Sequence, residues 1–425
     1  MTNTIKQKQS VAVIGSGISG LTCAYLLSQK HQVTLFEAND YIGGHTNTED
    51  VTIAGKVYPV NTGFIVFNDW TYPNFIKLMD KLGVKSEESE MSFSVRDANS
   101  GIEYNGTNLN SLFAQRINLI RPSFIRMILD ILKFNKQTVS ALENQQVQDG
   151  QTLGEFVQQH GYSRSFINHY IVPMGAAIWS ASVDVMMDFP LKFFLQFFNN
   201  HGMLSVDERP QWRVISGGSR SYIEAITAPF KDNIHLNTPI KSVTRSADSV
   251  TVTTQTGQQE VFDQVIFACH SDQALSILDD ATQDENDVLS AIPYQMNDVV
   301  LHTDVKVLPK RKLAWAAWNY HIPQRHSEHA MLTYNMNILQ NFDDAPETIL
   351  VTLNRNQDID QSKIIKQYRY AHPVFTLDGM VAQARHSDIS NHNRTHFAGA
   401  YWLNGFHEDG VNSALKVCKD FGIEL

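Results

Sequence analysis

Near the amino terminus, an apolar segment runs directly into a glycine-rich turn and then into a helix. Residues 11–14 are apolar and mostly β-branched, as in a strand buried on both faces. Residues 15–20 read Gly-Ser-Gly-Ile-Ser-Gly, and residues 21–29 have a helical pattern. A fold that binds a dinucleotide requires this order of strand, turn and helix. The sequence therefore predicts an α/β fold with a Rossmann-like domain.

Each glycine of the turn has a physical reason to be glycine. Gly15 permits the tight turn, Gly17 lets backbone N–H groups approach a pyrophosphate, and Gly20 lets the helix pack closely on the strand. The positive end of the helix dipole then faces the phosphates.

A second predicted strand, residues 32–36, ends on an acid. Glu37 follows Gly20 by seventeen residues, near the spacing of roughly 20 residues at which an acid binds a ribose hydroxyl. We assign Glu37 and the adjacent Ala38 to this contact. NAD and FAD share the arrangement, so other residues must distinguish them.

A pair of glycines follows the second strand, in the segment Gly43-Gly44-His45-Thr46. It resembles the GG motif of the flavin-containing amine oxidase and phytoene desaturase superfamily, which NAD dehydrogenases lack. The resemblance implies a second backbone approach to the same pyrophosphate and therefore FAD. Relatives usually carry Arg where this chain has His45, which is only partly protonated at neutral pH.

The carboxy-terminal residues resemble the second flavin-binding segment of the same superfamily. Residues 395–400 read as a strand ending at Gly399, and a helix is expected to begin near Val411 after the loop 405–410. The resemblance implies that Gly399, Asp409 and Gly410 cover the flavin ring. Ala400 stands where relatives commonly have Asp or Glu, a departure that affects one hydrogen bond to the cofactor.

The middle of the chain supplies a third segment, so the resemblance covers nearly all residues. Strands are expected at 234–236, 240–243, 250–254 and 261–268, with Val243 as the backbone contact to adenine that relatives make. The FAD-binding domain, of the GR2 type, is thus predicted to be discontinuous, comprising residues 1–90, 205–275 and 385–425. Residues 91–204 and 276–384 are predicted to form an α+β substrate domain.

The motifs and the resemblance together assign a non-covalent FAD site, because no cysteine lies shortly before the terminal strand. No metal site is expected. The residues assigned to the cofactor are Gly15, Gly17, Ile18, Ser19, Gly20, Glu37, Ala38, Gly43, Gly44, His45, Thr46, Thr62, Gly63, Val243, Gly399, Ala400, Glu408, Asp409 and Gly410.

Composition narrows the class of protein. A chain of 425 residues exceeds what one hydrophobic core usually organises. Its net charge of −10 argues against nucleic-acid binding. The three cysteines, Cys23, Cys269 and Cys418, form no metal-binding or disulfide pattern, and no signal peptide or membrane-spanning run is visible. A cytoplasmic enzyme is expected, and the oligomeric state stays open.

One segment is basic against this acidic background. After Arg121-Pro122 a helix is expected, with Phe124, Ile128, Ile131 and Leu132 on one face and Arg126, Asp130, Lys133 and Gln137 on the other. Two interpretations remain open. The helix packs on its own domain with its charges in water, which is the commoner case, or it makes peripheral contact with an anionic membrane on the cytoplasmic side.

The sequence patterns that could indicate a substrate site are less specific than those of the cofactor. Five phenylalanines in residues 189–198 fit an apolar channel or a core equally well. We assign Trp315, Trp318, Tyr401 and Trp402 to a wall over the flavin, with core packing as the alternative. Amine oxidases place a lysine near the strand that begins around residue 294, where it holds a water against flavin N5. This chain has Asn297-Asp298 there, which argues against amine oxidation.

A closer resemblance points to lipids. The segments GGHTNT, PMGAAIWS, GGSR, WAAWNY and FAGAYWLNGFHEDG are similar to those of a bacterial subfamily of FAD-binding oxidoreductases. That subfamily tends to accompany methyltransferases resembling cyclopropane-fatty-acid synthase, and some members are associated with desaturation of methylated acyl chains. The resemblance implies an acyl lipid as substrate.

The leading hypothesis is therefore dehydrogenation, with hydride passing from an organic substrate, such as an acyl lipid, to flavin N5. His45 and His407 are the candidate catalytic residues if a proton must leave in the same step. The alternatives are an amine oxidase that releases hydrogen peroxide, a non-redox flavin enzyme such as a double-bond isomerase, and a flavin-binding regulatory protein.

Overall fold

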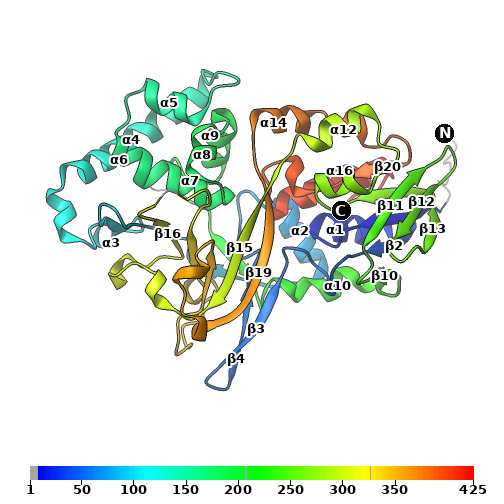
Figure 1. Cartoon of the computed structure of the whole chain (residues 1–425), viewed down its shortest axis with the longest axis horizontal. Helices are drawn as coiled ribbons and strands as arrows, with labels where there is room; N and C mark the ends of the chain where they lie inside the picture. The colour runs from blue at the N-terminus through cyan, green and yellow to red at the C-terminus, as the bar shows by residue number, and fades with distance from the viewer. Residues whose placement is uncertain (1–7, 206–207, 326) are drawn as a thin grey trace.

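A parallel sheet joins the beginning, the middle and the end of the chain (Figure 1). The computed structural model describes residues 8–205, 208–325 and 327–425. Its parallel sheet has the order β10-β2-β1-β14-β20. The strands are β1 (Ser10–Ile14), β2 (Gln32–Phe36), β10 (Ile234–His235), β14 (Gln264–Phe267) and β20 (Thr395–Phe397). The cofactor domain is thus assembled from distant segments, as the motifs predicted, although its boundaries stay predictions.

The central strand β1 is buried on both faces. Val11 and Val13 pack on one side with the helices α1 (Ile18–Leu27), α2 (Pro73–Leu82), α10 (Ile223–Thr227) and α16 (His407–Asp420). Ala12 and Ile14 pack on the other side. That side is covered by α11 (Ser271–Ile277), α12 (Gln283–Ser290) and the antiparallel strands β11 (Ile240–Arg245), β12 (Val250–Thr254) and β13 (Gln259–Phe262). Apolar residues on both faces are what a parallel sheet requires.

The second domain contains a mixed sheet of seven strands in the order β19-β15-β18-β17-β16-β7-β8. Strands β7 (Phe93–Asp97) and β8 (Glu103–Asn105) come from the first inserted segment. The other five come from the second: β15 (Tyr294–His302), β16 (Trp318–Ile322), β17 (Leu332–Asn335), β18 (Leu350–Leu353) and β19 (Ile364–Pro373). The two insertions therefore fold together.

Helices gather at one end of this domain, on the left of Figure 1. They are α3 (Leu109–Leu112), α4 (Pro122–Glu143), α5 (Leu153–Gln159), α6 (Arg164–Phe166), α7 (Val172–Trp179), α8 (Val183–Met187) and α9 (Leu191–Asn200). Their buried side chains form one cluster with those of the sheet, and it includes all five phenylalanines of residues 189–198. Those five are therefore core residues.

Smaller elements connect the two domains. The hairpin β3 (Thr48–Ile53) and β4 (Lys56–Asn61) protrudes below the molecule in Figure 1. Strands β5 (Phe67–Asn68), β6 (Ser86–Ser89) and β9 (Trp212–Ile215) form a three-stranded sheet. Helices α13 (Met336–Leu339), α14 (Leu377–Ala384) and α15 (His386–Ile389) complete the chain. No described helix is long and apolar enough to span a membrane.

Several expected element bounds were wrong. α1 begins at Ile18 and α16 at His407, each about one turn earlier than expected, because both helices start at the ends of the glycine loops. Residues 261–268 form parts of two strands rather than one. In both cases the apolar pattern located the element but not its ends.

The faces of α4 also differ from the expectation. Asp130 is buried, where its carboxylate accepts the N–H of Ser163 at 3.0 Å and pairs with Arg126 at 3.1 Å. Leu132, expected to face the core, is exposed. Asp130 is thus buried together with hydrogen-bonding partners, and the outward face of α4 includes an exposed leucine.

A buried ion pair fastens β11 to α12. The guanidinium of Arg245 binds Glu285 at 2.9 Å and Asp280 at 3.0 Å, and the side chains of Arg245 and Glu285 are almost fully buried. Replacing Glu285 by Ala leaves that guanidinium without its buried partner. We predict that Glu285→Ala lowers the free energy of unfolding by about 3 kcal/mol, measured by urea denaturation.

The matched control is an exposed pair, Lys192 and Asp149. Lys192→Ala should change stability by less than about 1 kcal/mol. Equal losses in the two variants would contradict a structural role for the buried pair.

Candidate flavin site

The first glycine loop forms an open cradle at the start of α1. Gly15 has φ +105° and donates its N–H to Phe36 O at 2.8 Å. A Cβ on Gly20 would lie 2.0 Å from the carbonyl oxygen of Gly15, whereas one on Gly17 would meet no atom within 4 Å. Gly17 is also the N-cap of α1 and makes no side-chain cap. Gly20 therefore serves packing, and Gly17 borders open space beneath a helix dipole.

The second glycine pair lies against the first loop. Gly43 and Gly44 both have positive φ, +126° and +58°. A Cβ on Gly44 would lie 3.3 Å from Gly17 Cα, and Gly43 donates its N–H to Ser16 Oγ at 3.1 Å. The two loops thus border the same space, which agrees with two backbone approaches to one pyrophosphate.

Glu37 is fixed at the end of β2. Its Oε2 accepts hydrogen bonds from Ser16 N at 3.0 Å and Ser16 Oγ at 2.6 Å, and its Oε1 accepts one from Asn39 N at 2.9 Å. The carboxylate is buried beside the cradle, while Ala38 is exposed.

The residue assigned to adenine has other partners. Val243 is fully buried, and its carbonyl accepts Asp279 N at 3.1 Å. Thr238 instead donates its N–H to Glu37 O at 2.9 Å. Thr238 thus joins this segment to the turn at Glu37, and the contact of Val243 with adenine stays a prediction.

The N-terminus of α16 packs directly on that of α1. A Cβ on Gly410 would lie 2.6 Å from Ile18 Cγ2 and 2.9 Å from Ser19 Oγ. Gly399 lies at the end of β20, where its N–H bonds to Ser413 Oγ of α16 at 3.0 Å, and Ala400 lies 3.8 Å from the same Cβ position on Gly410. The amino-terminal and carboxy-terminal motifs therefore meet at one point.

The two acids at the start of α16 both cap helices. Asp409 accepts the N–H of Phe406 at 2.9 Å, and burial raises the pKa of its carboxyl to about 6. Glu408 accepts the N–H groups of Asn74 and Phe75 at 3.1 and 2.7 Å. The side chain of Glu408, which we assigned to the cofactor, therefore caps α2.

His407 is held tightly from two sides. Its Nε2 lies 3.0 Å from Thr46 Oγ1, which also bonds to the hydroxyl of Tyr222. Its ring stacks on Phe64 with a centroid separation of 3.5 Å. Burial lowers the pKa of His407 to about 3. The imidazole is thus uncharged, and its Nε2 already has a hydrogen-bond partner.

His45 lies at the centre of a second group of rings, which joins the two domains. The ring centroids of His270, His372 and Tyr370 lie 6.4, 5.4 and 4.9 Å from that of His45. His372 and Tyr370 come from β19 of the substrate domain. Thr62 bonds to the Tyr370 hydroxyl at 3.1 Å. We call His45, His270 and His372 the histidine cluster.

The histidine cluster carries no charge at neutral pH. Burial is the largest cause of the lowered pKa in all three rings, and the pKa of His372 falls to about 4. The neighbouring imidazoles lower the pKa of His45 further. Among the described residues, the buried Nε2 of His45 has no hydrogen-bond partner.

The backbone keeps His45 in place. A Cβ on Gly63 would lie 2.2 Å from His45 O, and Phe64 donates its N–H to the same oxygen at 2.7 Å. Gly63 is therefore required by the close packing of two chain segments.

Asn297 occupies the region where we looked for a lysine. It is buried, and its Nδ2 lies 3.0 Å from His372 Nδ1. Its Oδ1 accepts from Asn354 Nδ2 at 2.8 Å. Asp298 is exposed and pairs with Arg369 at 3.4 Å. Asn297 thus positions a histidine of the cluster and brings no charge.

The four aromatic residues assigned to a wall do not form one. Trp315 packs beside Val300 and Val307, and its indole N–H donates to Pro309 O at 2.8 Å. Trp318 packs against Tyr334 in a different cluster. Tyr401 and Trp402 belong to the core around β14 and β20. Of the four, only Tyr401 and Trp402 contact each other.

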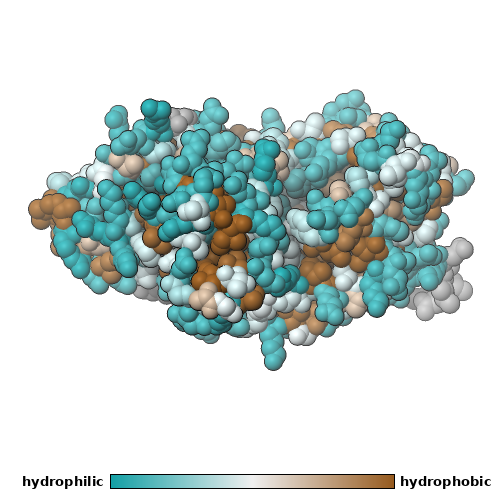
Figure 2. All heavy atoms as spheres, turned by 60° about the horizontal axis from the view of Figure 1, so that its bottom comes forward, coloured by the Kyte–Doolittle hydropathy of each residue, from teal (hydrophilic) through white to brown (hydrophobic). Residues whose placement is uncertain are grey.

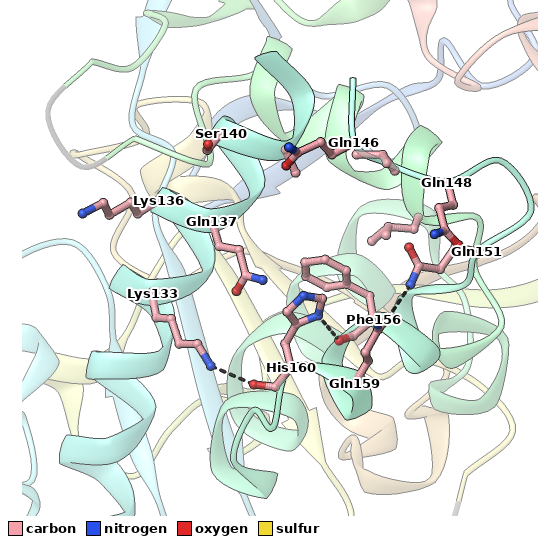
Figure 3. Close-up of a pocket in the computed structure, with 13 residues that line it drawn as sticks. Lys133, Lys136, Gln137, Ser140, Gln146, Gln148, Gln151, Phe156, Gln159 and His160 are labelled. Carbon is pink, nitrogen blue, oxygen red and sulfur yellow. Dashed lines mark hydrogen bonds between the residues drawn. The ribbon is translucent and has the colours of Figure 1, made fainter. Parts of the chain in front are cut away.

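Two site residues had no sequence signal of their own. His270 and His372 lie far apart in the chain, and neither belongs to one of the glycine-containing segments that indicate the cofactor. They meet because β19 brings its carboxyl end to the first domain. A cavity of 530 Å³ between α4 and α5 is lined by other residues and lies apart from this site (Figure 3).

Comparison with known proteins agrees with these motifs. The family model described as flavin-containing amine oxidoreductase matches residues 18–369. The chain belongs to this family. A search of curated protein sequences found no significant match. The protein is therefore an FAD-dependent oxidoreductase with a mixed α/β fold.

Solved structures of several enzymes share the fold. A fatty acid isomerase from P. acnes that produces CLA has a TM-score of 0.70 at 17% identity, covering 99% of this chain and 100% of the other. Cyclohexylamine oxidase from Brevibacterium oxydans has a TM-score of 0.69 at 14% identity, with coverages of 98% and 100%. Putrescine oxidase bound to putrescine has a TM-score of 0.66 at 17% identity, with coverages of 98% and 99%.

The residues fit FAD. Gly17 borders open space, the N-termini of α1 and α16 meet there, and Glu37 lies at the end of the neighbouring strand. Backbone N–H groups at helix N-termini suit a pyrophosphate.

Substitution by alanine should affect FAD affinity at Gly17 and the stability of the fold at Gly20. Gly17 has φ −64° and open space at its Cβ position, so Gly17→Ala should leave the stability of the flavin-free protein unchanged. It should weaken FAD binding by about tenfold or more, because the methyl group enters the cradle. FAD titration and urea denaturation measure the two quantities.

Gly20→Ala is the matched comparison. Its Cβ would collide with the backbone of Gly15, so the flavin-free protein should lose about 3 kcal/mol of stability. If Gly17→Ala were the destabilised variant and bound FAD normally, the cradle would be misassigned.

Acid should destabilise the fold at mild pH. Burial lowers the pKa of eight described histidines in the folded state: His45, His201, His270, His302, His321, His372, His386 and His407. The unfolded chain takes up these protons near its ordinary histidine pKa of about 6.5. Stability is therefore full above that pH and is lost as the pH falls. Burial raises the pKa of Glu408 and Asp409, which act in the opposite direction, but these are two groups against eight.

The measurement is the thermal midpoint of the flavin-free protein between about pH 7.5 and 5, where normal carboxylates stay ionised. A midpoint that falls steadily over this range agrees with the prediction. A constant midpoint would contradict burial of these rings in the neutral form.

Proposed function

We propose that the enzyme dehydrogenates an apolar acyl chain of a lipid, with FAD bound non-covalently. The observation that carries this proposal is the uncharged histidine cluster between the two domains, with Asn297 in place of a lysine. Bound FAD supplies a hydride acceptor at N5. The chain's own residues hold the substrate, exclude water and receive a proton.

The uncharged side chains of the histidine cluster suit a substrate that is itself uncharged. Amines are protonated at neutral pH, and a site that binds them gains from carboxylates or from an aromatic cage. Around His45 the polar groups are imidazoles, a phenol and an amide. The nearby carboxylate of Glu49 is already paired with Lys366, and Asp298 faces outward to Arg369. Such surroundings give a cation little stabilisation.

Apolar side chains approach the site from the substrate domain. Phe193 of α9 stacks on Phe375, and Phe197 stacks on Phe406, which precedes α16. Phe406 is partly exposed, and its N–H is capped by Asp409. These rings are packed core residues, but they make the surroundings of the α16 N-terminus apolar, which favours a hydrocarbon substrate there over a charged one. The fold shared with a fatty acid isomerase adds support of the same kind.

His45 is the better candidate for accepting a proton. Its Nε2 has no partner among the described residues, whereas His407 Nε2 already bonds to Thr46. In the dehydrogenation, a carbon of the acyl chain would lose a hydride, for which bound FAD would be the acceptor and oxygen or another oxidant the final one. A neighbouring carbon loses a proton to His45 Nε2 as the double bond forms. His407 acts as a positioning residue for Thr46 and Phe64.

Non-covalent binding agrees with the cysteines. Cys23 and Cys418 are fully buried, and burial raises the pKa of Cys269 to about 12, so its thiol stays protonated. Acid precipitation of the yellow protein should leave the flavin in solution. Colour that stays with the precipitate would contradict this part of the proposal.

The roles of the two histidines can be separated. We predict that His45→Gln lowers the rate of flavin reduction by acyl lipid about a hundredfold or more and removes the pH dependence that a base gives. His407→Gln should keep that pH dependence and change mainly the affinity for FAD. Anaerobic bleaching of the flavin band over a range of pH, with bound flavin quantified, measures both.

The alternatives give different products. A double-bond isomerase forms a product of unchanged mass without an electron acceptor. An amine oxidase releases hydrogen peroxide with putrescine or cyclohexylamine, the compounds named for two proteins of the same fold. Either result, with no desaturated lipid by mass spectrometry, would replace the proposed reaction.

A further inference from the structure

One end of the substrate domain exposes a group of aliphatic side chains. It comprises α3, the 3-10 turn Arg116–Ile120 and the outward face of α4. Leu109 is 75% exposed and Ile120 is 76% exposed. The other members are at least half exposed and are Ile117, Leu119, Leu129 and Leu132. Figure 2 shows hydrophobic atoms protruding at this end of the molecule. An exposed apolar group of this kind usually marks an interaction site.

The same segment is basic. Between residues 104 and 142 the only acid is Asp130, which is buried and paired with Arg126. The basic residues are Arg116, Arg121, Arg126, Lys133 and Lys136. This segment therefore has a net charge of +4, although the whole chain has −10. The elements that carry the exposed aliphatic side chains therefore also carry an excess of positive charge.

The arrangement on α4 places both kinds of residue outward. Phe124, Met127 and Phe134 face the core, whereas Leu129 and Lys136 lie on the opposite, exposed side. Figure 3 shows Lys136 pointing away from the cavity between α4 and α5. Lys136 is therefore available to a partner outside the molecule.

Arg121 adds a cation at the start of α4. Its Nη1 is buried and has no hydrogen-bond partner among the described residues. The residue as a whole is partly exposed next to Ile120, so it adds a positive charge at this end of the domain, although that nitrogen itself is not accessible to a phosphate.

We propose that this docking surface, formed by the six aliphatic and five basic residues named above, binds peripherally to an anionic lipid bilayer. The aliphatic side chains enter the headgroup region, and the basic residues contact lipid phosphates. The inference stands apart from the proposed reaction, because binding is measured without turnover.

The charge argues against a second copy as the occupant. A symmetric dimer would place the same cationic surface against itself, and like charges at an interface are unfavourable. An anionic bilayer has the opposite sign and accepts aliphatic side chains as well.

The test is co-sedimentation of the FAD-loaded full chain with lipid vesicles. Binding is expected with phosphatidylcholine vesicles that contain phosphatidylglycerol, and little with phosphatidylcholine alone. Added salt should weaken it. Ile120→Asp should lower the partition coefficient by about tenfold, and Lys136→Gln by about fivefold.

Val381→Asp is the matched control. Val381 is 64% exposed on α14, outside the docking surface, so this variant should bind as the wild type does. Retained flavin and an unchanged thermal midpoint show that each variant is folded. Three results would overturn the proposal: no preference for phosphatidylglycerol, wild-type binding by Ile120→Asp, or a dimer in sedimentation velocity that Ile120→Asp dissociates.

Discussion

The close contact between the N-termini of α1 and α16 is the constraint on which the rest of the structure depends. Gly410 packs within van der Waals contact of Ile18 and Ser19, so two positive helix ends lie side by side. The first turn of α16 contains two carboxylates, Glu408 and Asp409, whereas the first turn of α1 contains none, so the start of α1 is the helix end that suits the pyrophosphate of FAD. The strands β1, β14 and β20 fix the relative position of the two helices. The order of the strands therefore determines where the two helix ends that border the proposed cofactor site lie.

The histidine cluster determines the polarity of the site where the two domains meet. The loop that follows the glycine pair carries His45 towards β19, where His372 is held by Asn297. Burial keeps these imidazoles neutral. A lysine in the same region would bring a charge and a fixed water, whereas an amide only orients a ring. The same fold thus offers a site of different polarity from that expected of an amine oxidase.

The sequence predicted the cofactor side of the fold well, because that side depends on local rules. Strands β2 and β12 have the predicted bounds, and the Cβ position of Gly44 lies 3.3 Å from Gly17 Cα, so the two glycine loops lie side by side. The remainder depends on contacts between distant segments, which no local pattern encodes. Glu408 caps α2, Trp315 packs on the far side of its sheet, and His372 joins His45 only through β19. On α4, Asp130 is buried with a hydrogen bond from Ser163 and Leu132 is exposed, so the expected pattern fails at these two residues.

The central claim is that the neutral site removes hydride from an acyl chain. Its most direct test is stopped-flow reduction of the enzyme's flavin, without oxygen, by phospholipid vesicles with ordinary or fully deuterated acyl chains. The account predicts that the lipid bleaches the flavin and that deuterium slows the bleaching severalfold. Flavin that stays oxidised with lipid but is bleached by a primary amine would contradict it.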